Sequence, residues 1–136
     1  MHQIFIEYKG GLRTRAKHLK SGNEIFTDAP VDNHGKGEAF SPTDLAAAAL
    51  GSCILTIMGI AAESRGINLM GTYSEVTKVM GKKPRRIEEI NIQIYFKNNF
   101  SDSEKKILET SAHACPVHKS LHADMKKEII FHYPKL

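Results

Sequence analysis

The two cysteines of this chain, Cys53 and Cys115, each occur in a context that suits a reactive thiol. Cys53 lies inside a long stretch without charged residues, and Cys115 opens the segment Cys-Pro-Val-His that ends at His118. A thiolate, and not a thiol, attacks electrophilic oxygen or sulfur, so a nearby cation or helix N-terminus must lower the thiol pKa. The pair indicates thiol redox chemistry, although a free cysteine can also be an inert apolar residue.

Cys53 needs a cation from another segment, because the middle of a helix offers no terminus of its own. The candidates are Arg13, Arg15, Arg85, Arg86 and His118. Each arginine could instead be an ordinary strand or loop charge, and His118 an ordinary residue on a helix surface. The sequence leaves this choice open.

Zinc binding is the competing use of Cys and His side chains. Structural zinc takes four ligands that usually include close-spaced pairs, and here only Cys115 and His118 form such a pair. A site made of Cys53, Cys115, His118 and one further histidine is the alternative. The spacing favours no metal and no other cofactor.

Three antiparallel strands are expected in the N-terminal part of the chain. Hydrophobic alternation and Gly-rich turns place them at Gln3–Tyr8, Leu12–Leu19 and Glu24–Asp28. The strand pattern begins at the first residues and leaves no room for a secretion signal, and two distant cysteines are no secreted disulfide framework. A cytoplasmic location is therefore the expectation.

A long helix is expected from Pro42 to Arg65. Ser41 can cap it, Pro42 fits its first turn, and Asp44 places a carboxylate near its N-terminus. Apolar residues lie on every side of this helix, so we expect it to be buried on every side, partly by a second subunit. The uncharged stretch Leu45–Ala62 reaches the lower length limit of a membrane span, but its Ala and Gly content favours burial in protein.

Two strands, a helix and a closing strand are expected in the C-terminal part. The strands lie near Asn68–Val79, Ile87–Phe96 and Glu128–Tyr133. The helix starts at the capping box of Ser101 and Glu104 and carries Cys115 on its apolar side. Pro116 can start a further short helix, which would leave Cys115 at a helix N-terminus that favours the thiolate.

Composition limits the classes of function. With 136 residues, 41% hydrophobic and 25% charged, the chain fits one globular domain, residues 1–136. The formal net charge is +4, but the basic residues are scattered, with short runs at residues 82–86 and 126–127. Such runs are typical of solvated loops and strand ends, so we expect no nucleic-acid partner and no membrane partner.

Taken together, these motifs resemble those of the OsmC/Ohr family, the osmotically inducible protein and organic hydroperoxide reductase group. The resemblance covers essentially the whole chain. It rests on the motifs Ser41-Pro-x-Asp44-Leu and Gly51-Ser-Cys53 in the long helix and Cys115-Pro-Val after the second helix. It implies an α+β fold, an antiparallel sheet packed with long central helices, in which two chains intertwine as a homodimer with the cysteines at the interface.

The resemblance also implies an activity, the thiol-dependent reduction of organic hydroperoxides. Cys53 would be the peroxidatic residue, Cys115 the resolving one, and an external dithiol the reductant. Arg13 and Arg15 both lie near the strand position of the arginine that activates the peroxidatic thiol. Asp44 and His118 complete the candidate catalytic set.

One position departs from the family pattern. In the reductases a Glu follows the Ser-Pro or Asn-Pro pair and helps to hold the activating arginine, whereas here Thr43 occupies that position. The acid, Asp44, comes one residue later, and one residue turns a side chain by about 100° around a helix. The alternative function is therefore a non-catalytic domain that binds a small molecule or senses redox state.

Overall fold

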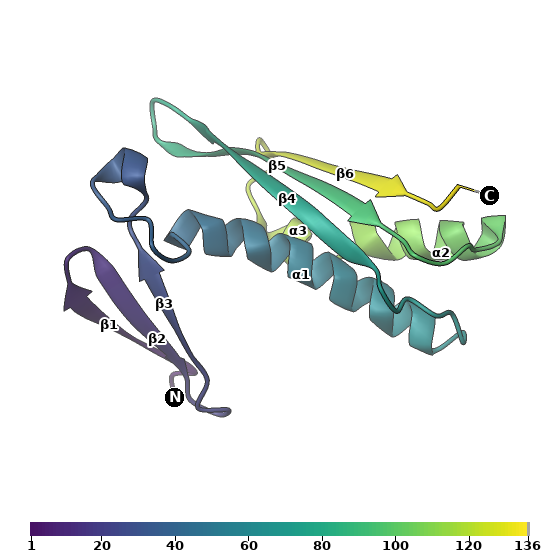
Figure 1. Ribbon diagram of the computed structural model, residues 1–136, viewed down its shortest axis with the longest axis horizontal. Coiled ribbons are helices and arrows are strands. Elements are labelled where there is room, and N and C mark those ends of the chain that lie inside the picture. The colour runs from purple at the N-terminus through teal and green to yellow at the C-terminus, as the bar shows by residue number, and fades with distance from the viewer. Residues whose placement is uncertain (136) are drawn as a thin grey trace. The chain divides into compact units, whose positions relative to one another are not determined.

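The structure is a computed structural model that describes residues 1–135. The chain forms two compact units, Met1–Ala46 and Ala47–Leu136. Each unit contains a three-stranded sheet, and the longest helix, α1 (Pro42–Glu63), begins in the first unit and continues into the second (Figure 1). The predicted α+β fold class is confirmed.

The first unit is an antiparallel sheet with the strand order β1-β2-β3. Its strands are β1 (Ile4–Gly10), β2 (Arg13–His18) and β3 (Glu24–Asp28). Arg13 pairs with Asp28 and Arg15 with Phe26 across β2 and β3. Because side chains alternate along a strand, these four side chains share one face of the sheet. A short 3-10 helix, η1 (Val31–Asn33), follows in the loop that leads to α1.

The opposite face of this sheet is apolar, and in the single chain it is exposed to solvent. Ile4 is 56% exposed, Ile6 63% and Ile25 46%. Exposed apolar patches of this kind on a soluble protein mark an interaction surface. We call Ile4, Ile6, Tyr8 and Ile25 the apolar sheet face.

Helix α1 begins with a reciprocal cap. The N–H of Asp44 donates to Ser41 Oγ at 3.0 Å, and the N–H of Ser41 donates to Asp44 Oδ2 at 3.0 Å. The helix ends at Glu63, and the chain turns at Gly66, which has a φ of 67°. The predicted start is confirmed, and the predicted end at Arg65 was two residues too late.

Only one face of α1 is buried within the single chain. The expectation of burial on every side included a second subunit and stays a prediction. The buried residues are Ala47, Leu50, Gly51, Ile54, Met58 and Ala62. The other face carries small and apolar residues, among them Ile60, which is 61% exposed. By length and hydropathy alone α1 could cross a membrane, but the core helix of a soluble protein passes the same test. Ala49, Ser52, Thr56 and Ile60 form what we call the open face of α1.

The second unit has a sheet with the strand order β4-β5-β6. Its elements are β4 (Tyr73–Gly81), β5 (Arg86–Tyr95), α2 (Asp102–His113), α3 (Pro116–Ser120) and β6 (Lys126–His132). Ile90, Ile92 and Ile94 alternate along β5 and are fully buried with residues of α1 and α2. The helices therefore cover one face of this sheet, as the alternation on β5 predicted.

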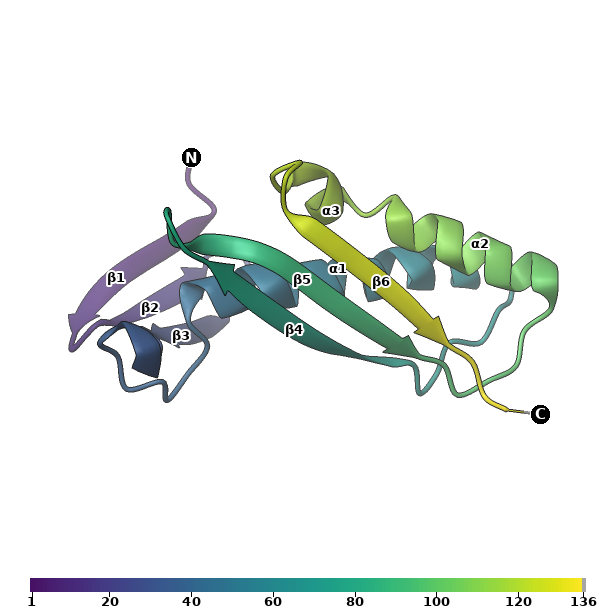
Figure 2. The same cartoon turned by 90° about the horizontal axis from the view of Figure 1, so that it is seen from above.

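Two details of this unit differ from the predictions. Strand β6 runs parallel to β5, as Figure 2 shows, so the second sheet is mixed and not purely antiparallel. Strand β4 starts at Tyr73 and not near Asn68. The Asn68 side chain accepts the N–H of Met70 at 2.9 Å, and Gly71 has a φ of 86°, so a turn occupies the residues before the strand.

Gly51 lets α1 approach the sheet two residues before Cys53. A Cβ atom at Gly51 would lie 2.8 Å from Val76 Cγ2 on β4, whereas one at Gly59 would meet nothing within 4 Å. We expect Gly51→Ala to lower the free energy of unfolding by up to about 2 kcal/mol, since overpacking costs about 1–3 kcal/mol and Ala gains about 1 kcal/mol in helix propensity. Gly59→Ala is the matched control and should stabilise the chain. Urea unfolding measures both, and a stabilised Gly51→Ala variant would contradict the close contact.

Candidate active site

Cys53 lies in the middle of α1 and is half-buried. Its side chain packs against the hydrophobic core of the second unit, and it is a free thiol. The neighbouring residue, Ser52, is exposed and belongs to the open face of α1. The position of Cys53 between the core and the open face gives its sulfur access to both.

Cys115 is fully buried at the junction of α2 and α3. It is the N-cap of α3, and its Sγ accepts the backbone N–H of His118 at 3.4 Å. Pro116 occupies the first turn of α3, as the sequence predicted. The local sequence therefore fixes both the position and the hydrogen bond of this thiol.

The two cysteines meet across the core of the second unit. Burial raises the pKa of Cys115, a hydrogen bond with the Cys53 side chain raises it further, and the N–H of His118 opposes both. Cys115 is therefore a protonated thiol near pH 7. The expected helix N-terminus at Cys115 is present, but the expectation that it favours a thiolate there is wrong, because burial outweighs it.

His118 lies beside Cys115 but supplies no positive charge near pH 7. Burial lowers the pKa of its imidazole, and Lys127, His113 and Lys119 lower it further by repulsion. Its backbone N–H donates to the Cys115 sulfur. His118 thus helps to place the resolving candidate and is not the cation that Cys53 requires.

The lowered pKa of His118 predicts a loss of stability on acidification. Between its folded pKa and the ordinary value of 6.5 the unfolded chain binds more protons, so the free energy of unfolding falls as the pH drops below about 6.5. We expect His118→Gln to make this loss between pH 7.5 and 5.5 smaller in urea unfolding. His2→Gln, a change at an exposed residue, should leave the pH dependence as it is, and equal behaviour of the two variants would refute the assignment.

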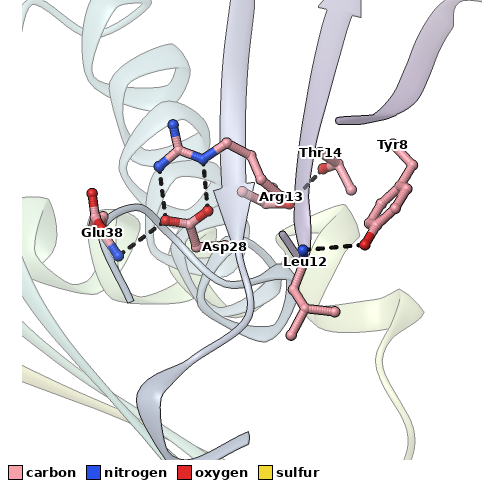
Figure 3. A network of polar contacts seen from close by, with 7 residues as sticks. Tyr8, Leu12, Arg13, Thr14, Asp28 and Glu38 are labelled. Carbon is pink, nitrogen blue, oxygen red and sulfur yellow. Dashed lines mark hydrogen bonds and ion pairs between the residues drawn. The ribbon is translucent and has the colours of Figure 1, made fainter. Parts of the chain in front are cut away.

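Arg13 forms a bidentate ion pair with Asp28, which Figure 3 shows. Nε donates to Oδ1 at 2.8 Å and Nη2 donates to Oδ2 at 2.9 Å. The hydrogen bond and the charge of Asp28 raise the pKa of Arg13, and the hydrogen bond of Arg13 lowers the pKa of Asp28. Both groups are therefore charged over the whole physiological range.

Arg15 is shared between two acids on the same sheet face. Its guanidinium lies 3.3 Å from Glu7 Oε1 and 3.4 Å from Glu24 Oε2, and both of these carboxylates are exposed by more than a third. Exposed ion pairs of this kind contribute little to stability. The two candidate arginines thus have clearly different surroundings within the first unit.

The remaining candidates have other positions. Asp44 belongs to the cap of α1. Arg85 is exposed in the turn between β4 and β5, and Arg86 is exposed at the start of β5. Within residues 1–135, no group of three or more Cys, His, Asp or Glu side chains could hold a metal ion, so the structure does not assemble the alternative zinc site. The structure brings together Cys53, Cys115 and His118 in the second unit and holds Arg13, Arg15 and Asp44 in the first.

Sequence reasoning missed Asp28, which is 3% exposed. It lies at the end of a predicted strand, where an acidic residue usually indicates a turn. The signal that could have found it is the register, because an antiparallel pairing of the second and third predicted strands sets Asp28 opposite Arg13.

Comparisons with known proteins place this chain among related sequences and structures. The family model described as OsmC-like protein matches residues 35–129. No curated protein matches the chain significantly. A Psychrobacter arcticus 273-4 protein, described as an osmotic stress induced and detoxification response protein, is 53% identical, with 97% of this chain and 96% of that chain covered and a TM-score of 0.94.

Two more distant structures share the fold. An OsmC-like protein from Mycoplasma pneumoniae has a TM-score of 0.77 at 18% identity, with 98% of this chain and 96% of that chain covered. An organic hydroperoxide resistance protein from Elizabethkingia anophelis has a TM-score of 0.76 at 14% identity, with 98% of each chain covered. At these identities the likeness concerns the fold alone.

Proposed function

The chain belongs to the OsmC-like protein family, and from this premise we propose that it is a thiol-dependent peroxide reductase acting on organic hydroperoxides. Family membership and the names of similar proteins, which refer to osmotic stress, detoxification and hydroperoxide resistance, support a redox role in the stress response. The more specific assignment, the reduction of organic hydroperoxides, depends on the two thiols of this chain.

The contact between Cys53 and Cys115 is the observation that carries the proposal. Both thiols are free, both pack in one core, and the Cys53 side chain is close enough to raise the pKa of Cys115. Two thiols in contact can alternate between a dithiol and a disulfide without a large movement of the backbone. An inert core cysteine requires no second cysteine beside it.

The first chemical step is an attack on the peroxide. The Cys53 thiolate attacks the distal oxygen of ROOH, an S–O bond forms as the O–O bond breaks, and the sulfur loses two electrons. The alkoxide leaves and takes a proton to become the alcohol. Cys53 is then a sulfenic acid.

The second step closes a disulfide. The Cys115 sulfur attacks the sulfenic sulfur, an S–S bond forms, the S–O bond breaks, and hydroxide leaves with the Cys115 proton as water. Because the pKa of Cys115 is raised, its thiol holds its proton until this step, in which the leaving hydroxide takes the proton as the sulfur attacks. An external dithiol then reduces the disulfide, which is consistent with the expected cytoplasmic location.

Assembly as a homodimer is part of the proposal. The open face of α1 and the apolar sheet face are both uncovered in the single chain, with Ile60 61% and Ile6 63% exposed. A two-fold dimer is the commonest way to cover such surfaces. We expect the second copy to cover them and to complete the surroundings of Cys53.

Peroxide-driven disulfide formation tests the proposal. One equivalent of cumene hydroperoxide should produce a Cys53–Cys115 disulfide, visible by mass spectrometry as a linked pair of proteolytic peptides that dithiothreitol separates. The Cys115→Ser variant should stop at the sulfenic acid of Cys53, which dimedone traps. Unchanged free thiols after this treatment would refute the function.

A non-catalytic binding or redox-sensing domain is the second candidate. It is favoured by Thr43, which stands where reductases of the family have the Glu that helps to hold the arginine. Such a domain would form the disulfide slowly or only with stronger oxidants. Rates measured with cumene hydroperoxide and with hydrogen peroxide separate the two functions.

A further inference from the structure

We propose that a hollow between the end of α1 and one face of α2 binds a small organic anion, a carboxylate or a phosphate ester with a short apolar part. The hollow lies wholly within the second unit and has a volume of about 420 Å³, inside the range of roughly 300–1,000 Å³ that is usual for small-molecule sites. We call it the helix hollow. It is lined by Arg65, Ser103, Lys106, Ile107, Thr110 and Ser111.

One wall of the helix hollow is a single face of α2. Its five residues follow the spacing i, i+3, i+4, i+7 and i+8, which places them along the same side of a helix. Ile107 and Ser111 are half-buried, whereas Ser103, Lys106 and Thr110 are exposed. The wall therefore changes from apolar at its base to polar at its rim.

Arg65 forms the opposite wall, two residues after the end of α1. Its Nη1 donates to the carbonyl of Ala61 at 3.2 Å and to Ser64 Oγ at 3.2 Å. These bonds hold the guanidinium against the last turn of α1. Among the described residues, the hydrogen bonds of this side chain use Nη1, so Nε and Nη2 can donate to a ligand.

The two cations of the helix hollow lack carboxylate partners. Among residues 1–135, no acid forms an ion pair with Arg65 or Lys106, and none lines the hollow. Other cations of the chain, such as Arg13 and Lys126, do have a carboxylate within ion-pair distance. Like charges on one concave surface repel each other and attract a counter-ion, so the hollow is suited to an anion.

The other lining groups indicate an organic anion. The Thr110 hydroxyl forms no hydrogen bond with the described residues and can donate to an anionic oxygen, whereas the Ser111 hydroxyl donates to the carbonyl of Ile107 at 2.8 Å. The Ile107 side chain and the alkyl chains of the two cations offer apolar contact. One end of the ligand is therefore charged and the other end apolar. Neither cysteine lines the hollow, so the site is separate from the proposed peroxide chemistry.

A titration followed by amide NMR spectra tests the site in the parent protein at low salt. The probes are hexanoate, hexyl phosphate, 1-hexanol and inorganic phosphate. We expect hexanoate or hexyl phosphate to shift the signals of Lys106, Thr110 and Ser111 with a dissociation constant of about 1 mM or tighter. The tighter of these two probes identifies the anionic group. 1-Hexanol and inorganic phosphate each lack one half of the ligand and should bind at least about fivefold more weakly.

Charge removal on the two walls provides the matched variants. We expect Arg65→Gln and Lys106→Gln each to weaken binding about threefold and the double variant about tenfold, the size usual for partly exposed ion pairs. The control is the double variant Lys105→Gln/Lys119→Gln, which removes the same charge from residues that do not line the hollow. Its affinity should stay within twofold of the parent.

The results that would overturn the site are equally direct. They are signals that shift linearly up to about 20 mM of both organic anions, binding of 1-hexanol or inorganic phosphate as tight as theirs, or shifts centred on residues outside the hollow. Equal losses of affinity in the two double variants would also overturn it. The titration contains no peroxide, so the result is the same whether or not the protein reduces hydroperoxides.

Discussion

Replacing Cys53 by Ser is expected to reduce the peroxide-dependent oxidation of dithiothreitol by at least about a hundredfold, to the rate without protein. A serine hydroxyl is not ionised near pH 7 and cannot accept the peroxide oxygen as a sulfenic acid. The assay follows the loss of cumene hydroperoxide in the presence of dithiothreitol. The effect is the largest that we expect from any single substitution, because no second thiol of this chain can replace Cys53.

Cys115→Ser provides the comparison. Cys115 is buried and protonated, so it cannot start the reaction, but its loss should leave the first turnover intact and slow only the later ones. Rapid mixing with one equivalent of peroxide measures the first turnover. Equal first-turnover rates in Cys53→Ser and in the parent would contradict the assignment of Cys53 as the attacking thiol.

Placing a charge on the open face of α1 is expected to destroy the assembly. Ile60 is 61% exposed in the single chain, so Ile60→Glu would change the stability of a monomer by no more than about 0.5 kcal/mol. In a dimer that covers this face, an unpaired buried carboxylate would cost about 3–5 kcal/mol. We therefore expect Ile60→Glu to be insoluble or dissociated, whereas the parent should sediment at twice the chain mass of 15.2 kDa.

Met70 offers a matched control for this prediction. It is 79% exposed and lies in the turn before β4, outside helix α1. Met70→Glu should sediment like the parent. A parent protein that sediments as a stable 15.2 kDa species at micromolar concentration would contradict the predicted dimer.

The elements specified by local sequence were predicted correctly. The capping box of Ser101 and Glu104 is present, and so is Cys115 before Pro116 at the start of α3. These features depend on the capping and helix-start preferences of residues that lie only a few positions apart in the sequence. The alternation on β5 likewise identified the face that is buried.

The features set by long-range pairing were not predicted. The ion pair of Arg13 and Asp28 depends on the register of two strands, and the parallel direction of β6 depends on the path of the intervening helices. The charge state of Cys115 depends on burial by segments that are distant in the sequence. Burial raises the pKa of this thiol more than the backbone N–H at the start of α3 lowers it. In each case the pairing or the charge state is determined by a tertiary contact. The local sequence pattern either does not specify it or predicts it incorrectly.

The parallel pairing of β5 and β6 also determines when the two thiols can meet during folding. Parallel neighbours need a crossover, and here that crossover consists of α2 and α3 with Cys115 at their junction. Contacts that close so long a loop form late, after the β4–β5 hairpin and the helices. We expect the thiol of Cys115, which is buried only in the packed second unit, to be accessible to oxidants and to other chains until that unit is complete. The refolding yield should therefore depend on a reducing solution even though the native protein contains no disulfide.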